Sequence, residues 1–397
     1  MKAGRIIVFR GIVVGLSLGS LIAFCLPARA NAEESSRFYR EGREHVGQGR
    51  NVEAVRAFRK AADEGDAAAI DFLGWMYLEG RGVPKSPWIA FGHFMDAAAK
   101  GNDQACRNLG NMYFNGVDID QDYAQAAKWW EKGAKRGSYR AAASLAQLLF
   151  TGDGVPVDKQ KAIEHWAMAA QNAPKDDKSL AVALAFARIE AGKPDVAKEA
   201  RNRLKTLAER GNRPATDALK YLAARENREA LLVEIPFVHQ AYNHCGVASG
   251  TMALRHQGCD VSQFDVKRLC PRSKRGHGVF WSKLLIAAEK CKHRWRIEEY
   301  AVTDEGFEKG KTLLLEELSA GRPVIIDWLT DPDNTSAHSV VLCGYDKGTK
   351  EFLFRNPALT FPGIHVLSEA RFKEIWRSRG YIPNNDVVRR PLIRIVD

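Results

Sequence analysis

Apolar and small residues in the middle of the chain recur with a step of 36 residues. Leu73 and Gly80 have counterparts at 109–116, and the same pattern returns in altered form at 145–152. Self-similarity at this length is typical of solenoids, in which each unit is a pair of helices that buries its apolar face against its neighbours. The pattern therefore predicts an array of helical hairpins over residues 67–171.

Three kinds of position repeat within each unit, and each has its own physical role. A small residue in the first helix lets the paired helix approach closely. A glycine ends that helix, because glycine readily adopts the left-handed conformation found at helix C-termini. A tryptophan is expected to anchor the second helix. These positions are Gly74, Gly110 and Ala146 for the close approach, Gly80, Gly116 and Gly152 for the helix end, and Trp88, Trp129, Trp130 and Trp166 for the anchor.

Helical character extends beyond the strict repeat on both sides. Residues 37–66 supply at least one helix of a leading unit, 178–211 read as a degenerate unit, and 215–225 are expected to cap the array. We therefore assign residues 33–228 to one helical repeat domain. We expect packing between neighbouring units, rather than contacts with the rest of the chain, to stabilise it.

The 36-residue step stops near residue 230, where short runs rich in Val, Ile, Leu and Phe begin to alternate with helical segments. The pattern predicts an α+β domain over 229–397, so the fold class is multidomain: an all-α repeat solenoid followed by an α+β domain. The expected helices are Val247–His256, Val279–Cys291 and Lys311–Ala320, and the expected strands are Pro323–Leu329, His338–Tyr345 and Glu351–Arg355.

The first 32 residues have the pattern of a secretory signal. A basic start is followed by an uncharged apolar run from Gly11 to Leu26, and small residues precede a preferred cleavage site between Ala32 and Glu33. A run of about 16 residues is short for a membrane span, which needs about 20. We predict a cleaved signal peptide at 1–32, a periplasmic or secreted mature protein, and no stable membrane span after cleavage. An uncleaved N-terminal anchor is the alternative.

The formal net charge of the chain is +11. Four of the basic residues lie in the predicted signal, which leaves the mature chain at +7. The remaining Lys and Arg are scattered among acidic residues, whereas recognition of nucleic acid requires a basic cluster on one element. We therefore expect no nucleic-acid partner.

Four residues of the α+β domain have the types and order of a thiol hydrolase site. Cys245 precedes a helical segment, where unpaired N–H groups favour a thiolate and depress the thiol pKa. His338 begins an apolar strand and would serve as the base. Asn356 follows the next strand and could orient the imidazole, and Gln240 could donate its amide to the oxyanion together with the N–H of Cys245.

The repeat region resembles the Sel-one-like branch of the tetratricopeptide repeat superfamily, whose signature contains the small residue, the Tyr and the Gly-x-Gly-Val turn seen at Gly80–Val83. Such repeats serve as protein-contact surfaces in that family. The resemblance therefore implies a protein partner on the array as a whole, while we assign each individual aromatic residue to its core.

Residues 233–378 resemble the bacteriocin-processing (double-glycine leader) peptidase family, in what looks like its stand-alone branch. The resemblance rests on Gln240, Cys245-Gly246 with Ala248, the segment Gly321–Ile325, the segment Ala337–Asp346, and Asn356-Pro357. It implies a papain-like fold and thiol-dependent hydrolysis of amide bonds, with a protein or peptide as substrate. The matching catalytic positions are Cys245, His338, Asn356 and Gln240.

The chain departs from that family in three respects. Asn356 stands where the family usually has Asp, which would polarise the imidazole less, and His244 replaces a frequent Asp. The membrane transporter that accompanies leader-peptide processing is absent from this chain. We therefore do not extend the leader-peptide substrate to it.

The remaining cysteines and histidines indicate no cofactor and no metal site. Cys259, Cys270 and Cys291 lie near one another in the sequence, so one disulfide among them is an open possibility in an exported protein. A zinc site that combines Cys270 and Cys291 with His277 and His293 matches no usual ligand spacing.

The leading hypothesis is an exported cysteine peptidase whose repeat array recruits a partner or the substrate. A rival hypothesis is a protein-binding adaptor in which the papain-like domain is catalytically silent. A third hypothesis is a transferase that uses the same nucleophile but passes the acyl group to an acceptor other than water, because papain-like thiols also catalyse acyl or peptidyl transfer.

Overall fold

The structure is a computed structural model, and the predicted signal peptide at 1–32 lies outside the residues that it describes. The described residues are 37–116, 119–174, 177–227, 229–240, 245–270, 281–329, 337–359, 361–376, 378–379 and 388–396. None of the helices in these segments is long and apolar enough to cross a membrane.

The repeat region is all-helical, as predicted. Its helices are α1 (Arg37–Gly47), α2 (Asn51–Asp63), α3 (Ala67–Glu79), α4 (Pro87–Ala99), α5 (Asp103–Asn115), α6 (Tyr123–Lys135), α7 (Tyr139–Thr151), α8 (Lys159–Asn172), α9 (Ser179–Glu190), α10 (Pro194–Glu209) and α11 (Arg213–Glu226).

The C-terminal region mixes helices and strands. Its elements are β1 (Leu231–Leu232), α12 (Cys245–His256), α13 (Gln263–Leu269), α14 (Trp281–Lys290), β2 (Trp295–Ala301), α15 (Asp304–Ser319), β3 (Val324–Leu329), β4 (Ala337–Asp346), β5 (Glu351–Arg355), β6 (Ile364–Ser368), α16 (Glu369–Ile375), β7 (Ser378–Arg379) and β8 (Val388–Ile395).

The 36-residue step sets where the helices of the array begin and end. The side chains of Asp66 and Asn102, one step apart, accept hydrogen bonds from first-turn N–H groups of α3 and α5. Gly80, Gly116 and Gly152 follow α3, α5 and α7 with φ of 70°, 61° and 69°, the left-handed conformation that stops a helix. The predicted helix ends are confirmed.

The predicted close approach of the two helices in a unit is also confirmed. A Cβ on Gly74 would lie 2.6 Å from the ring of Phe94, and one on Gly110 would lie 2.4 Å from the ring of Trp130. No side chain larger than hydrogen fits at these contacts unless the second helix moves away.

The prediction that Trp88 anchors α4 is wrong. Its side chain is 66% exposed, because the second residue of α4 faces away from α3. The residues that occupy the anchoring position are Phe94, Trp130 and Trp166, one step apart and at most 3% exposed. Trp129 is only half-buried, so the neighbouring Trp130 is the anchor in that unit.

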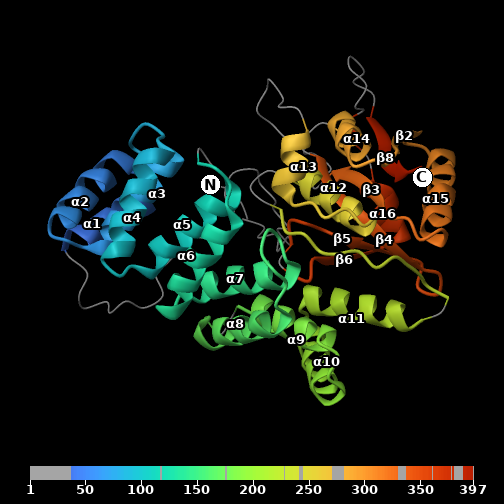
Figure 1. The fold of residues 1–397 in the computed structure, drawn as a ribbon, viewed down its shortest axis with the longest axis horizontal. Helices are drawn as coiled ribbons and strands as arrows, with labels where there is room; N and C mark the ends of the chain where they lie inside the picture. The colour runs from blue at the N-terminus through green and yellow to red at the C-terminus, as the bar shows by residue number, and fades with distance from the viewer. Residues whose placement is uncertain are drawn as a thin grey trace, which may run out of the picture.

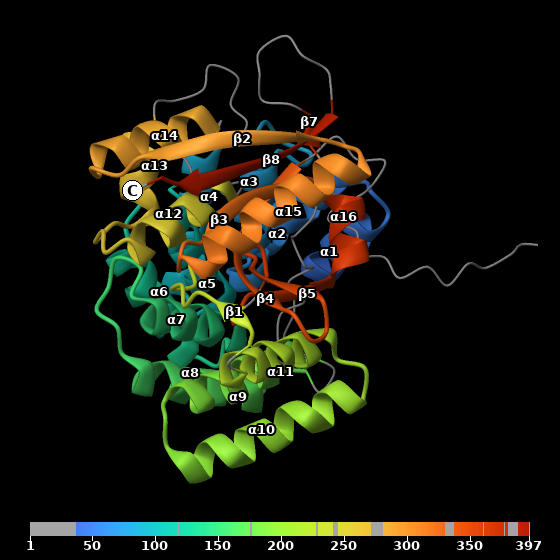
Figure 2. The same ribbon diagram turned by 90° about the vertical axis from the view of Figure 1, so that its right-hand side faces the viewer.

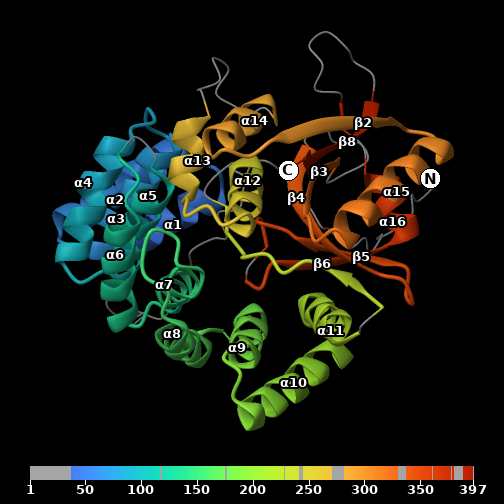
Figure 3. The same cartoon turned by 45° about the vertical axis from the view of Figure 1, so that its right-hand side comes forward.

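The array curves around the C-terminal domain rather than standing apart from it. In Figure 1, α1–α6 lie to one side, α8 lies below α7 and α11 lies beneath the sheet, and Figure 3 shows α11 under β6. Arg213 of α11 donates to the carbonyl of Val366 at 2.9 Å, and Arg355 of β5 donates to the hydroxyl of Tyr221 at 3.0 Å. The segment expected to cap the array is therefore an interface helix.

The C-terminal domain is built on an antiparallel sheet with the strand order β2-β8-β3-β4-β5-β6, in which β1 pairs with β4 and β7 with β8. Helix α12 packs on β4 and β3, and Figure 2 shows β2 and β8 crossing the far side of the sheet from α11. The three predicted strands correspond to β3, β4 and β5, each within one residue at either end.

Strands β2 and β8 were not expected from the sequence, because both carry several charged residues. They pair with each other, and Arg394 forms an ion pair with Glu298 across them at 2.6 Å. Arg390 is buried and donates to the carbonyls of Ala301 and Thr303. Pairing of these charges lets a sequence rich in charged residues form the β2–β8 edge of the sheet.

The two regions share one apolar core. Among the described residues, the largest cluster of buried side chains runs from Ala134 of α6, through Trp166 and Tyr221, to Ile395 of β8. Three smaller clusters belong to the array alone. The C-terminal half of the array is thus stabilised by the C-terminal domain as well as by its own units, which differs from our expectation.

Candidate active site

Cys245 is the first residue of α12, as the sequence suggested, and its side chain is half-buried. The helix that it opens is buried from Gly246 to Leu254 and packs on β4. Ser249, one turn further on, donates to the carbonyl of Ser339 at 3.1 Å. This packing holds the thiol against the start of β4, beside the residue that follows His338.

His338 and Asn356 form the hydrogen bond that the sequence predicted. Nε2 of His338 lies 2.7 Å from Oδ1 of Asn356, and both side chains are buried. The same oxygen accepts the backbone N–H of Ala358 at 3.0 Å, which fixes the orientation of the amide. Since Oδ1 can only accept, Nε2 carries the proton and Nδ1 is the unprotonated nitrogen of the neutral ring.

Burial decides the protonation states of the two groups. Burial lowers the pKa of His338, and the hydrogen bond to Asn356 and the nearby carboxylate of Asp327 offset part of that effect. Burial raises the pKa of the Cys245 thiol, against opposing hydrogen bonds from the backbone of Ser339 and Gly246. The expected depression of the thiol pKa is therefore not seen. The site holds a neutral thiol and a free-base imidazole at neutral pH.

Asp327 and Ser339 form a polar pair next to the site that the sequence analysis missed. They face each other across β3 and β4, and the Ser339 hydroxyl donates to the Asp327 carboxylate. Asp327 is only 1% exposed, and its charge acts on the pKa of both Cys245 and His338. An acidic residue inside the apolar segment 324–329 is the signal that could have revealed it.

A second missed neighbour is His365 on β6. Its ring lies 5.5 Å from that of Trp328, the residue paired with His338 across the sheet. The pKa of His365 is lowered to about 4. Burial is the largest cause, and the positive charges of Arg213 and His338 add smaller effects in the same direction. His365 therefore stays neutral and adds no charge to the surroundings of His338 at neutral pH.

Gln240 lies beside the strand-end segment that carries Asn356. Its backbone N–H donates to the carbonyl of Pro357 at 3.0 Å. Its side-chain Oε1 is buried and has no hydrogen-bond partner among the described residues. The structure thus brings Gln240 and Asn356 together, while residues 241–244, between Gln240 and Cys245, lie outside the described part of the chain.

The six described cysteines are free thiols, and the described residues contain no group of side chains arranged to hold a metal ion. Cys259 and Cys291 lie within reach of a thiol–thiol hydrogen bond, and their proximity contributes to the raised pKa of Cys259 after burial. Cys270 is buried and donates to the carbonyl of Lys283 at 3.4 Å. His277 of the zinc alternative lies outside the described residues.

Comparison with protein families agrees with this architecture. Residues 232–383 match the Peptidase_C39 like family, and residues 67–102, 103–138 and 140–174 match the Sel1 repeat. The chain thus contains Sel1 repeats followed by a Peptidase_C39-like domain. This combination indicates a papain-like peptidase fold joined to repeats of a kind that commonly mediate protein–protein contacts.

Similar solved structures come from the repeat side of the chain. One is a Sel1 repeat protein from Oxalobacter formigenes, 23% identical, with a TM-score of 0.42, covering 47% of this chain and 76% of that one. Another is c5321, a protective antigen of uropathogenic Escherichia coli with an SLR fold, 20% identical, with a TM-score of 0.43, covering 71% and 57%. No curated protein matches the chain.

Proposed function

We propose that this chain is an exported cysteine peptidase that hydrolyses peptide or amide bonds with Cys245, His338 and Asn356. The observation that carries the proposal is the buried 2.7 Å hydrogen bond between His338 Nε2 and Asn356 Oδ1, which joins the start of β4, the strand on which α12 packs, to the end of β5. It selects the tautomer in which Nδ1 can accept a proton, which is the role that the third member of such a triad plays.

The chemistry follows from that tautomer. Nδ1 of His338 takes the proton of the Cys245 thiol, and the thiolate attacks the substrate carbonyl carbon. The amide of Gln240 and the backbone N–H of Cys245 donate to the oxygen on which negative charge develops. His338 then gives its proton to the leaving amine. Water, deprotonated by the same imidazole, releases the acyl group from Cys245 and regenerates the thiol.

Cleavage of a signal peptide at 1–32 would place the mature protein in the periplasm or outside the cell, and the repeat array would recruit a protein partner or substrate there. Support for this part of the proposal comes from the basic, apolar and small-residue pattern of the N-terminus and from the Sel1 repeats.

A catalytically silent adaptor is the second candidate, and one observation favours it. Burial raises the pKa of Cys245 and lowers that of His338, so both shifts oppose the ion pair on which a reactive thiol depends. The enzyme requires that mutual attraction between thiolate and imidazolium overcome this cost.

Alkylation of the reduced mature protein by iodoacetamide at pH 7, followed residue by residue, separates the two candidates. The enzyme predicts that Cys245 reacts at least about tenfold faster than half-buried Cys291, and that His338→Ala removes the advantage. Cys245→Ala controls for the assignment of the signal. Equal rates at the two cysteines, unaffected by His338→Ala, would support the adaptor.

A further inference from the structure

The loop between β5 and β6 begins at the triad candidate Asn356 and packs one side chain against the repeat array before β6 begins. It carries Phe361, which is only 3% exposed. The Phe361 ring lies 4.6 Å from that of Phe150, stacks on Trp166 at 4.8 Å and meets Phe186 at 5.7 Å. These three partners belong to α7, α8 and α9, so the loop is held by three successive helices of the array.

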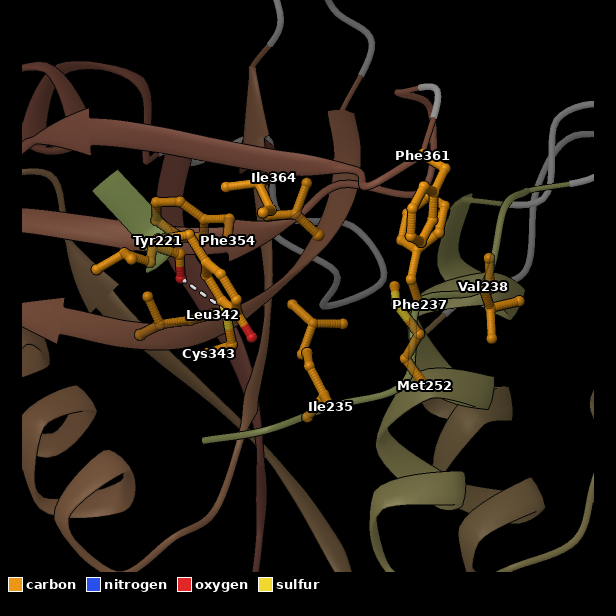
Figure 4. Packing of buried hydrophobic residues seen from close by; sticks show 14 of the residues in the cluster. Tyr221, Ile235, Phe237, Val238, Met252, Leu342, Cys343, Phe354, Phe361 and Ile364 are labelled. Atoms are coloured by element: carbon orange, nitrogen blue, oxygen red, sulfur yellow. Dashed lines mark hydrogen bonds between the residues drawn. The ribbon is translucent and has the colours of Figure 1, made fainter. Parts of the chain in front are cut away.

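The Phe361 ring also packs against the segment that leads to Gln240. Phe361 lies 6.0 Å from Phe237, and Figure 4 shows the two rings together above Met252 of α12. A Cβ on Gly363 would lie 1.9 Å from the Phe237 ring, so the backbone of the loop approaches this ring as closely as only glycine allows. The aromatic contact therefore joins the array, the Asn356 loop and the segment that leads to Gln240.

A polar link reaches the other side of the site. Asp153, in the turn after α7, is 2% exposed, and its carboxylate accepts from Arg255 of α12 at 2.9 Å. Its other oxygen accepts from Gln263 at 3.1 Å, and Gln263 also donates to the carbonyl of His239 at 2.6 Å. His239 directly precedes Gln240, so a carboxylate of the third repeat lies two hydrogen bonds from the oxyanion candidate.

The segment that contains His239 and Gln240 and the loop between β5 and β6 are also hydrogen-bonded to each other. The backbone N–H of Gln240 donates to the carbonyl of Pro357 at 3.0 Å, and Nδ1 of His239 lies 3.2 Å from the carbonyl of Leu359. The Asn356 N–H donates to the carbonyl of Gly363 at 2.7 Å, which closes the loop. The two segments are thus bonded to each other, and each is attached to the array.

From these contacts we infer that the repeat array is a structural part of the active site, and that Phe361 and Asp153 are positioning residues for Asn356 and Gln240. The inference rests on the proposed function for the roles of Asn356 and Gln240. Displacement of a reacting group by about 1 Å can reduce the rate by about 10²-fold, so a support remote from the chemistry can control it.

Two variants of the full mature protein test the inference, each with a matched control. Phe361→Ala removes the aromatic contact, and Phe94→Ala removes an equally buried ring from the array alone. Asp153→Asn keeps the volume but removes the charge that faces Arg255, and Asp71→Asn makes the same replacement at a buried aspartate of α3 that accepts a hydrogen bond from Asn108. If Phe361→Ala does not fold, Asp153→Asn tests the inference on its own.

The first readout is amide hydrogen exchange, followed by mass spectrometry, in peptides that contain the N–H groups of Gln240 and Asn356. Both test variants should speed exchange there at least about tenfold, while both controls leave it unchanged. Exchange that is unaltered in the test variants, or equally faster in the controls, overturns the inference. This readout needs no catalysis, so it decides the point whatever the outcome for the proposed function.

The second readout is the His338-dependent alkylation of Cys245, with its pH profile. Phe361→Ala and Asp153→Asn should slow it by about tenfold or more and flatten its dependence on pH, while the controls keep the wild-type profile. Wild-type profiles in all four folded variants overturn the inference. If alkylation of Cys245 in the wild-type protein does not depend on His338, the proposed function is refuted. The hydrogen-exchange result alone then decides whether the array supports the two segments.

Discussion

Replacement of Asn356 by aspartate adds one buried charge at the centre of the site without a change of shape. Oδ1 of Asn356 accepts from His338 Nε2 at 2.7 Å and from the N–H of Ala358 at 3.0 Å, and a carboxylate oxygen can accept both. A hydrogen bond to a charged partner contributes about 1.5–3 kcal/mol, compared with about 1 kcal/mol for a neutral pair. A difference of about 1.4 kcal/mol raises the pKa of the imidazole by about one unit.

The expected result of Asn356→Asp is therefore a pKa of His338 that rises by about one unit, opposite to the effect of burial. Imidazolium would then persist to higher pH and stabilise the thiolate of Cys245, so alkylation at pH 6 should become up to about tenfold faster. The His338 pKa is measured from the pH titration of its ring protons by NMR, and alkylation is followed on the same samples.

Asn111→Asp is the matched control, because Oδ1 of Asn111 accepts from the Trp130 indole at 3.2 Å in the array. It adds the same charge far from the site and should leave both measurements unchanged. An Asn356→Asp variant in which the His338 pKa stays the same or falls would refute the reasoning, and would remove Asn356 from the proposed triad.

Three further predictions concern other parts of the molecule. Burial raises the pKa of Asp71 to about 7, so its contribution to stability is complete below its unfolded value of 3.8 and is lost as the pH rises through 7. Asp71→Asn should remove up to about 4 kcal/mol of that pH dependence in urea unfolding, and an unchanged dependence would contradict the assignment. Gln240→Ala should leave Cys245 alkylation nearly intact but reduce turnover of any accepted substrate by about 10²–10³, whereas unaltered turnover would exclude the oxyanion role. If the protein is exported, unreduced peptide mapping should find a disulfide between Cys259 and Cys291, and a bridge that includes Cys270 would show that another pair oxidises.

The fold was largely predictable wherever it depends on local signals. Glycines in the left-handed conformation, polar N-caps and the apolar segments of β3, β4 and β5 appear in the sequence at the positions where the structure uses them. Trp88 has the sequence pattern of a core residue, because it is bulky, apolar and near a helix start, yet its side chain is exposed. Only the exact 36-residue step that joins Phe94 to Trp130 identifies the residue that is buried.

The candidate site was predicted in its residues but not in its surroundings. Order and spacing point to Cys245, His338 and Asn356, because each lies at one end of an element that the apolar pattern reveals: Cys245 begins α12, His338 lies at the start of β4 and Asn356 follows β5. Contacts between distant segments have no such local signal, and Asp327 and Asp153 are examples. A buried carboxylate is stable only beside the groups that donate hydrogen bonds to it, and for Asp327 and Asp153 those groups come from other parts of the sequence.

Two of the small apolar clusters lie within α1–α5 and are separate from the large cluster that begins at α6, which has a consequence for how the chain can change length. Each small cluster is completed by adjacent helices, so the free end of the array can gain or lose whole 36-residue units while each remaining interface stays intact. From α7 onward the same operation would remove helices that contact Phe361, in the loop that carries the triad candidate Asn356. The number of repeat units can therefore change without a change in the contacts of the candidate site, but only at the N-terminal end of the array.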